Sequence, residues 1–142
     1  MADVHPTITG IHHFSATVRD LEASVDWHQK VFGLERLPGT YPHYEREETG
    51  YAVLLIDPKS GLGIGLHANT GNQGEQFDEC RTGLDHVGLN VTDWSGLERW
   101  AEHLTSIGVQ HSGIRDIKEP IAFCTVVFRD PDNIQLELFT MG

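Results

Sequence analysis

Cysteine is scarce in this chain of 142 residues, and the two that occur, Cys80 and Cys124, are not spaced as a CxxC pair. The sequence therefore indicates neither a disulfide framework nor a thiolate zinc site, and both residues are predicted to be free thiols. Basic residues are also few, since 10 Lys and Arg stand against 21 Asp and Glu, for a formal net charge of -11. This charge repels phosphate backbones and anionic lipid, so we expect neither nucleic acid nor a membrane as a partner.

Long hydrophobic runs are missing as well. No stretch approaches the roughly 18 apolar residues of a membrane-spanning helix. The N-terminal segment MADVHPTITG lacks the basic-then-apolar layout of a secretion signal, and we therefore expect a cytoplasmic protein. With 39% hydrophobic residues, the chain is long enough for a single compact domain that buries a core without covalent staples.

The chain contains an internal repeat. The segment IHHFSATVRDLEASVDWHQKVFG matches LDHVGLNVTDWSGLERWAEHLTSIG when it is shifted by 73 positions, which places His13 on His86. The Asp-Pro turns at Asp57 and Asp130 keep the same shift. Chance rarely preserves such a register over so many residues, so we infer two related modules.

Each module is predicted to contain a strand, a helix and three further strands. The opening strands alternate apolar and polar residues and are followed by Asp20 and Asp93, which are suited to cap the helices; Gly33 and Gly108 stand at the expected helix ends. The polar, glycine-rich stretch 69–83 is expected to link module one, about 8–68, to module two, about 84–140. The fold class is therefore α+β, and its strands are expected at 11–18, 35–46, 50–57, 63–68, 84–91, 109–116, 121–129 and 133–139.

Four metal-binding side chains fall on the polar faces of these strands. The alternate apolar residues must face the helices, which turns His13 and His86 of the opening strands, and His67 and Glu137 of the last strands, to the opposite side. Each histidine alone is more typical of a hydrogen-bonded structural residue, but three histidines and one glutamate at repeat-equivalent positions favour a metal site. Imidazole and carboxylate donors suit Zn, Ni, Fe, Co or Mn better than Ca or Mg.

The segments IHHFSATVRD, GLDHVGLNV and RDPDNIQLELF resemble those of the vicinal-oxygen-chelate superfamily, which includes glyoxalase I, extradiol dioxygenases and fosfomycin- and bleomycin-resistance proteins. The resemblance implies a glyoxalase-like fold in which two tandem βαβββ modules form a cup-shaped mixed sheet around one divalent metal. It implies metal ligation by His13, His86 and Glu137. It also implies a homodimer, in which one subunit contributes His13 and His67 and the other contributes His86 and Glu137.

His67 departs from the family pattern, because glyoxalase I-like members usually carry Glu there and epimerase-like members Gln. It is predicted to be either a fourth metal ligand or a base beside the metal. The leading hypothesis is a metal-dependent lyase or isomerase, with Glu137 or His67 as the catalytic base, acting on a small substrate with two adjacent oxygens. The alternatives are an Fe(II) extradiol-type dioxygenase and a metal-free protein that binds an antibiotic or another small molecule. Substrate contacts are suggested for Tyr44, Arg46, Tyr51, Arg81 and Cys124.

Overall fold

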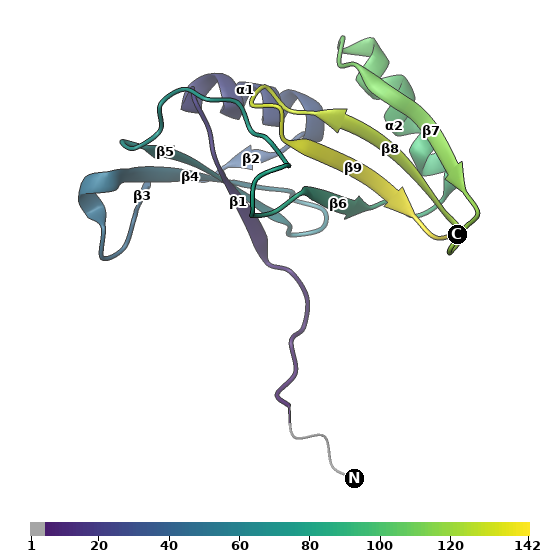
Figure 1. Cartoon of the computed structure of the whole chain (residues 1–142), viewed down its shortest axis with the longest axis horizontal. Helices are drawn as coiled ribbons and strands as arrows, with labels where there is room; N and C mark the ends of the chain where they lie inside the picture. Colours follow the sequence, from purple (N-terminus) through teal and green to yellow (C-terminus); the bar gives the residue numbers. More distant parts are fainter. Residues whose placement is uncertain (1–4) are drawn as a thin grey trace. The chain divides into compact units, whose positions relative to one another are not determined.

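The computed structural model describes residues 5–142, so the first four residues of the N-terminal segment lie outside the described residues (Figure 1). The chain divides into two compact units, with the boundary between Gln73 and Gly74. Each unit has its own β-sheet and one α-helix. The predicted α+β class is confirmed.

The first unit begins with the strand β1 (His13–Thr17) and the helix α1 (Leu21–Phe32). Its remaining elements are β2 (Glu35–Arg36), β3 (Tyr41–Pro42), the short 3-10 helix η1 (Glu47–Thr49), β4 (Gly50–Ile56) and β5 (Gly63–Asn69). The sheet has the order β1-β5-β4-β2, with β3 also paired to β4. The β1–β5 pair is parallel and the pairs of β4 with β2, β3 and β5 are antiparallel. The strand order makes β1 an edge strand beside β5.

The predicted continuous strand 35–46 is wrong. Only two short pieces of it, β2 and β3, pair with β4. Pro38 and Gly39 separate them, and Gly39 has a φ of 83°, while Glu45 further along has a φ of 65°. Proline cannot donate to a strand ladder and a positive φ breaks the extended backbone, so the segment folds as turns between two brief pairings.

The second unit follows the predicted strand-helix-three-strand order. It contains β6 (His86–Asn90), α2 (Trp94–Ser106), β7 (His111–Ile117), β8 (Phe123–Arg129) and β9 (Gln135–Thr140). The sheet order is β6-β9-β8-β7, and β6 runs parallel to β9. The edge strand β6 therefore has the same place beside β9 that β1 has beside β5.

The predicted helix boundaries are confirmed by the capping contacts. The side chain of Asp20 accepts a hydrogen bond from the backbone N–H of Ala23 at 3.1 Å, and that of Asp93 accepts one from Gly96 at 2.9 Å. Gly33 ends α1 in the left-handed region, with a φ of 68°. Within residues 5–142, no helix is long and apolar enough to cross a membrane.

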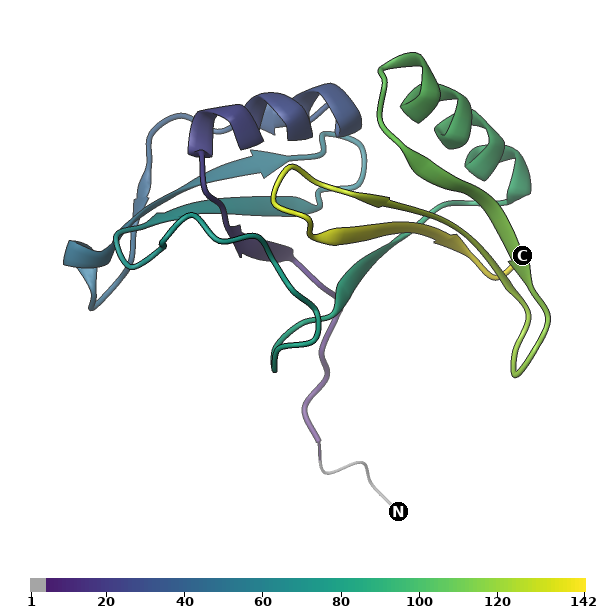
Figure 2. The same ribbon diagram turned by 45° about the horizontal axis from the view of Figure 1, so that its top comes forward.

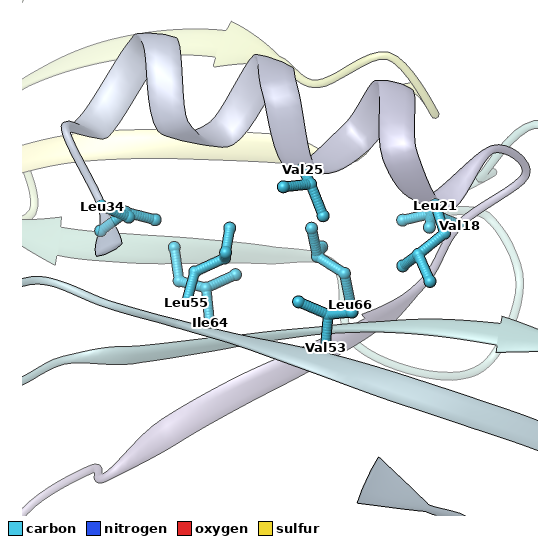
Figure 3. Close-up of a cluster of buried hydrophobic side chains, with 8 residues drawn as sticks. All are labelled: Val18, Leu21, Val25, Leu34, Val53, Leu55, Ile64 and Leu66. Atoms are coloured by element: carbon cyan, nitrogen blue, oxygen red, sulfur yellow. The ribbon is translucent and has the colours of Figure 1, made fainter. Parts of the chain in front are cut away.

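In each unit the helix lies along one face of its own sheet (Figure 2). In the first unit, the core between α1 and the sheet consists of aliphatic side chains from the helix, the strands and the flanking turns (Figure 3), namely Val18, Leu21, Val25, Leu34, Val53, Leu55, Ile64 and Leu66. In the second unit, the buried aliphatic residues are Leu97, Leu104, Val126, Leu136 and Leu138. Because these side chains occupy one face, the alternate residues of the same strands face away from the helix, as predicted.

Candidate metal centre

The polar face of the first unit is built on the parallel pair of β1 and β5. His13 pairs with Gly63, and Thr17 pairs with His67, so both histidines project from the same side of the sheet. The glycines of β5 make room for the side chains of β1. A Cβ added at Gly63 would lie 2.9 Å from the Cβ of His13 and 3.3 Å from a methyl group of Leu54, closer than such atoms normally approach.

His13 is oriented by the residue that precedes it. The Nδ1 atom of His13 lies 2.8 Å from the Nδ1 atom of His12, and both side chains are exposed. One of these two nitrogens must donate and the other accept. Since the contact uses Nδ1 of His13, its Nε2 atom is the nitrogen that remains to bind a ligand on the polar face.

His67 is held by a second histidine that sequence analysis did not single out. Its Nδ1 atom lies 2.9 Å from Nε2 of His43, and Nδ1 of His43 lies 2.7 Å from the hydroxyl oxygen of Thr49. His43 is 8% exposed. Burial, followed by the neighbouring imidazoles of His43 and His13, lowers the pKa of His67 below its usual value. The neutral form of His67 that results at neutral pH is the form that binds a metal or accepts a proton.

In the second unit, His86 and Glu137 lie on adjacent strands. Gly88 of β6 pairs with Glu137 of β9, one alternate position along from His86. The Nε2 atom of His86 is 3.7 Å from Oε2 of Glu137, which is too long for a hydrogen bond. A transition-metal ion forms bonds of about 2.0–2.2 Å to such atoms, so one ion can contact both. The donor chemistry and spacing therefore fit a divalent metal.

The orientation of His86 is fixed in the way that is typical of metal ligands. Its Nδ1 atom lies 2.7 Å from Oδ1 of Asp85, which as a carboxylate accepts the N–H. This places the proton on Nδ1 and leaves a lone pair on Nε2, the atom that faces Glu137. Carboxylate–histidine pairs of this kind are the usual outer partners of metal-binding histidines. Asp85 occupies the repeat position of His12.

Glu137 is held by a chain of polar side chains. Gln135 donates from Nε2 to Oε1 of Glu137 at 3.0 Å, and Arg129 donates to the Oε1 atom of Gln135 at 3.1 Å. Arg129 also forms two hydrogen bonds to Glu79, at 2.8 and 3.1 Å, and this contact lowers the pKa of Glu79 to about 2. Because Oε1 of Glu137 is engaged by Gln135, Oε2 is the oxygen directed toward His86.

Each unit thus presents two of the four predicted ligands. His13 and His67 project from one face of the first unit, and His86 and Glu137 meet in the second. Among residues 5–142, no group of three or more His, Cys, Asp or Glu side chains is arranged to hold a metal ion. The complete four-residue site therefore stays a prediction, while the geometry of each half supports it.

Comparison with known proteins identifies the family. The model of the Glyoxalase/Bleomycin resistance protein/Dioxygenase superfamily matches residues 10–138. The chain belongs to this superfamily. The match includes the opening strands of both units and extends into β9 as far as Leu138, so all four predicted ligands lie within it.

Relatives of known structure share the fold. A glyoxylase/bleomycin resistance protein/dioxygenase domain from Frankia sp. EAN1pec is 29% identical, with a TM-score of 0.80 over 96% of this chain and 100% of that chain. A mutant of the fosfomycin resistance protein FosX from Listeria monocytogenes, complexed with Mn(II) and a dihydroxypropylphosphonic acid, is 18% identical, with a TM-score of 0.60 over 93% of this chain and 92% of that chain. At this identity, the FosX match shows the fold alone.

A curated relative is the proposed ring-cleaving dioxygenase MhqA of Bacillus subtilis (strain 168). It is 28% identical over 107 residues, which are 75% of this chain and 33% of MhqA. The chain therefore spans about a third of the length of the curated relative that it matches.

Proposed function

We propose that this protein is a metal-dependent lyase or isomerase acting on a small substrate with two adjacent oxygens. In this proposal, His13, His86 and Glu137 hold one divalent transition ion, which is Zn, Ni, Fe, Co or Mn. His67 is either a fourth ligand or the catalytic base. The observation that carries the proposal is the pair formed by Nε2 of His86 and Oε2 of Glu137, which lie 3.7 Å apart with their other polar atoms already engaged.

Residues of the site would move a proton from one atom of the substrate to another. When bound, the ion would act as a Lewis acid toward the adjacent oxygens of the substrate and stabilise charge that develops on them. Nε2 of His67 would accept a proton from a substrate carbon and return it to the neighbouring atom, so the isomerisation balances without an oxidant. Glu137 is the second candidate base, through Oε2, because Gln135 occupies its other oxygen.

We also propose that the functional form is a homodimer. Each unit offers two donors, and the superfamily resemblance implies that units from two subunits combine at one metal. In that arrangement His13 and His67 of one subunit face His86 and Glu137 of the other. Light scattering coupled to size-exclusion chromatography tests this, with a mass near twice that of the 15.8 kDa chain expected. A cytoplasmic location stays a prediction.

Metal binding is the first test of the proposal. We expect a tightly bound divalent ion in the purified protein, and an affinity loss of more than about 100-fold in His86→Ala and in Glu137→Gln, since even outer partners of a metal site typically contribute about 10–100-fold. His103→Ala is the matched control, because it removes an imidazole from α2, on the far face of the same sheet. Equal affinities in all four proteins would contradict the proposal and favour a metal-free binding protein.

The reaction type needs a separate measurement. In D2O, a lyase or isomerase should exchange the proton on the substrate carbon beside its carbonyl, and proton NMR would follow this exchange across a panel of α-hydroxy ketones and hemithioacetals. Exchange should be lost in Glu137→Gln, because that variant binds the metal weakly, and it should also be lost in metal-loaded His67→Ala if His67 is the base. Metal-loaded protein that exchanges no substrate in the panel but consumes oxygen would overturn the lyase or isomerase assignment.

A ring-cleaving dioxygenase is the second candidate. It is favoured by the 28% identity to MhqA, and a set of two histidines and one carboxylate is typical of non-haem Fe(II) oxygenases. Protein loaded anaerobically with Fe(II) would be mixed with catechols and hydroquinones in an oxygen electrode. Oxygen uptake with ring cleavage would establish this activity, and its absence with proton exchange present would exclude it.

A further inference from the structure

His43 is a buried histidine that the proposed mechanism does not use directly. It lies just beyond β3, in the segment where the predicted strand fails, and it connects His67 to the 3-10 helix η1. The contacts form a continuous chain from the carbonyl of Arg46 through Thr49 and His43 to His67. Every link is between 2.7 and 2.9 Å, which is the range of good hydrogen bonds.

The donor and the acceptor of each hydrogen bond in this chain are determined at the end that is farthest from His67. The hydroxyl group of Thr49 has one proton, and it donates that proton to the carbonyl oxygen of Arg46 at 2.7 Å. A carbonyl oxygen can only accept. The oxygen of Thr49 must therefore accept from His43, which places a proton on Nδ1 of His43.

The same reasoning assigns the proton of each imidazole ring. A neutral imidazole has one N–H, so Nε2 of His43 carries a lone pair and must accept from Nδ1 of His67. His67 then has its own proton on Nδ1 and a lone pair on Nε2. A free histidine side chain in water prefers the opposite tautomer, so the surroundings must impose this one.

The ring geometry agrees with this chain. The planes of His43 and His67 differ by 20°, and their centroids are 5.0 Å apart. The two ring radii and the 2.9 Å contact together span that separation, so the contacting nitrogens lie near the line between the two ring centres. Nε2 of His67 lies above β5, 3.6 Å from where a Cβ on Gly65 would stand.

We infer that His43 and Thr49 are positioning residues that hold His67 in the Nδ1–H tautomer, with the Nε2 lone pair presented on the polar face. This deepens the proposed function, on which it rests only for the use made of that lone pair. His67 can act as a ligand or base through Nε2 only in this tautomer. Without His43, its ring could rotate or shift its proton to Nε2, and the lone pair would leave the face.

The test measures the tautomer directly in metal-free protein. At pH 8, two-dimensional 15N–1H NMR of the imidazole rings distinguishes a protonated nitrogen from one with a lone pair. We expect the wild-type protein to show Nδ1 protonated and Nε2 unprotonated in both His43 and His67. A proton on Nε2 of His67 in the wild-type protein would overturn the inference outright.

Variants of His43 separate positioning from packing. His43→Phe fills the buried space but offers no acceptor, so we expect His67 to become a mixture of tautomers. His43→Gln keeps a carbonyl oxygen that can accept from Nδ1 of His67, and we expect it to restore the wild-type spectrum. Equal spectra of His67 in the wild-type and Phe proteins would overturn the inference.

Thr49 provides an independent test with smaller changes. Thr49→Val removes the hydroxyl group while keeping the shape of the side chain, and both rings should then become mixtures of tautomers. Thr49→Ser keeps the hydroxyl group and should retain the wild-type tautomers. An unchanged spectrum in Thr49→Val would contradict the chain as drawn. Because these spectra contain no metal, a failure here is distinct from a failure of the proposed function, which the metal affinities of the His86 and Glu137 variants test separately.

Discussion

The first unit orients its donors with imidazoles, whereas the second uses charged groups, either directly or through an amide. In the first, an imidazole contacts each donor: His12 for His13, and His43 for His67. In the second, a carboxylate holds His86, and Glu137 is held by Gln135, which is itself fixed by a guanidinium. The repeat therefore preserves where the donors stand, while the groups that aim them differ between the halves.

This difference has a physical reason. Glu137 carries a negative charge and is held by an amide donor backed by the ion pair of Arg129 and Glu79. His67 is neutral, and a neighbouring charge would alter its proton occupancy, so a neutral chain suits it better. The presence of His at one repeat position and Glu at the other thus requires a different set of partners around each.

Glycines that lie beside the donors should give the largest difference in stability between variants of the two units. Gly63→Ala should cost about 1–3 kcal/mol, because the new methyl group would be forced against His13 and Leu54. Gly88→Ala in β6 meets nothing within 4 Å and should change the free energy of unfolding by less than about 0.5 kcal/mol. Urea denaturation measures both values. Similar losses in the two variants would show that the close packing under His13 does not affect the free energy of unfolding.

The residues that precede the two opening histidines should differ in their effect on metal affinity. Asp85→Asn replaces a charged acceptor of the His86 N–H with a neutral one, and we expect about a tenfold weaker affinity. His12→Asn exchanges one neutral partner for another and should weaken binding by less than about threefold. Competition with a chromophoric chelator measures both. A larger loss of metal affinity in His12→Asn than in Asp85→Asn would contradict the expectation that the charged partner of His86 matters more than the partner of His13.

The charged chain of the second unit should also respond to pH. Arg129 lowers the pKa of Glu79 from 4.5 to about 2, so their contact stabilises the fold above about pH 4.5 and is lost as the pH falls toward 2. Glu79→Gln should lower the Tm at pH 7 by about 1–2 °C, a small effect because the pair is partly exposed. The difference from the wild-type protein, followed by differential scanning calorimetry, should shrink between pH 4.5 and 2.

Glu102→Gln controls for the loss of one negative charge, since Glu102 is exposed on α2. Its Tm should match that of the wild-type protein across the same pH range. If Glu79→Gln and Glu102→Gln behave alike, the ion pair contributes nothing specific to the second unit.

Much of the fold follows from local patterns. Alternation predicted which faces of β1, β5, β6 and β9 are buried, and the Asp caps predicted where both helices begin. The residues of segment 35–46 favour a strand, but Pro38 and Gly39 interrupt it with a turn, so the pattern of the neighbouring residues predicts the wrong structure. His43 lies in that segment, so its contact with His67 could not be anticipated.

The sequence by itself determined the repeat, the side of each strand on which His13, His67, His86 and Glu137 stand, and the superfamily. The side of each strand follows from the period of two along a strand, which any extended chain obeys. Only the tertiary structure decided which atom of His67 is presented, because that depends on a hydrogen bond to His43, which stands 24 positions away in the chain. The ring nitrogen of His67 is chosen by this partner in space, and no local pattern in the sequence encodes the contact.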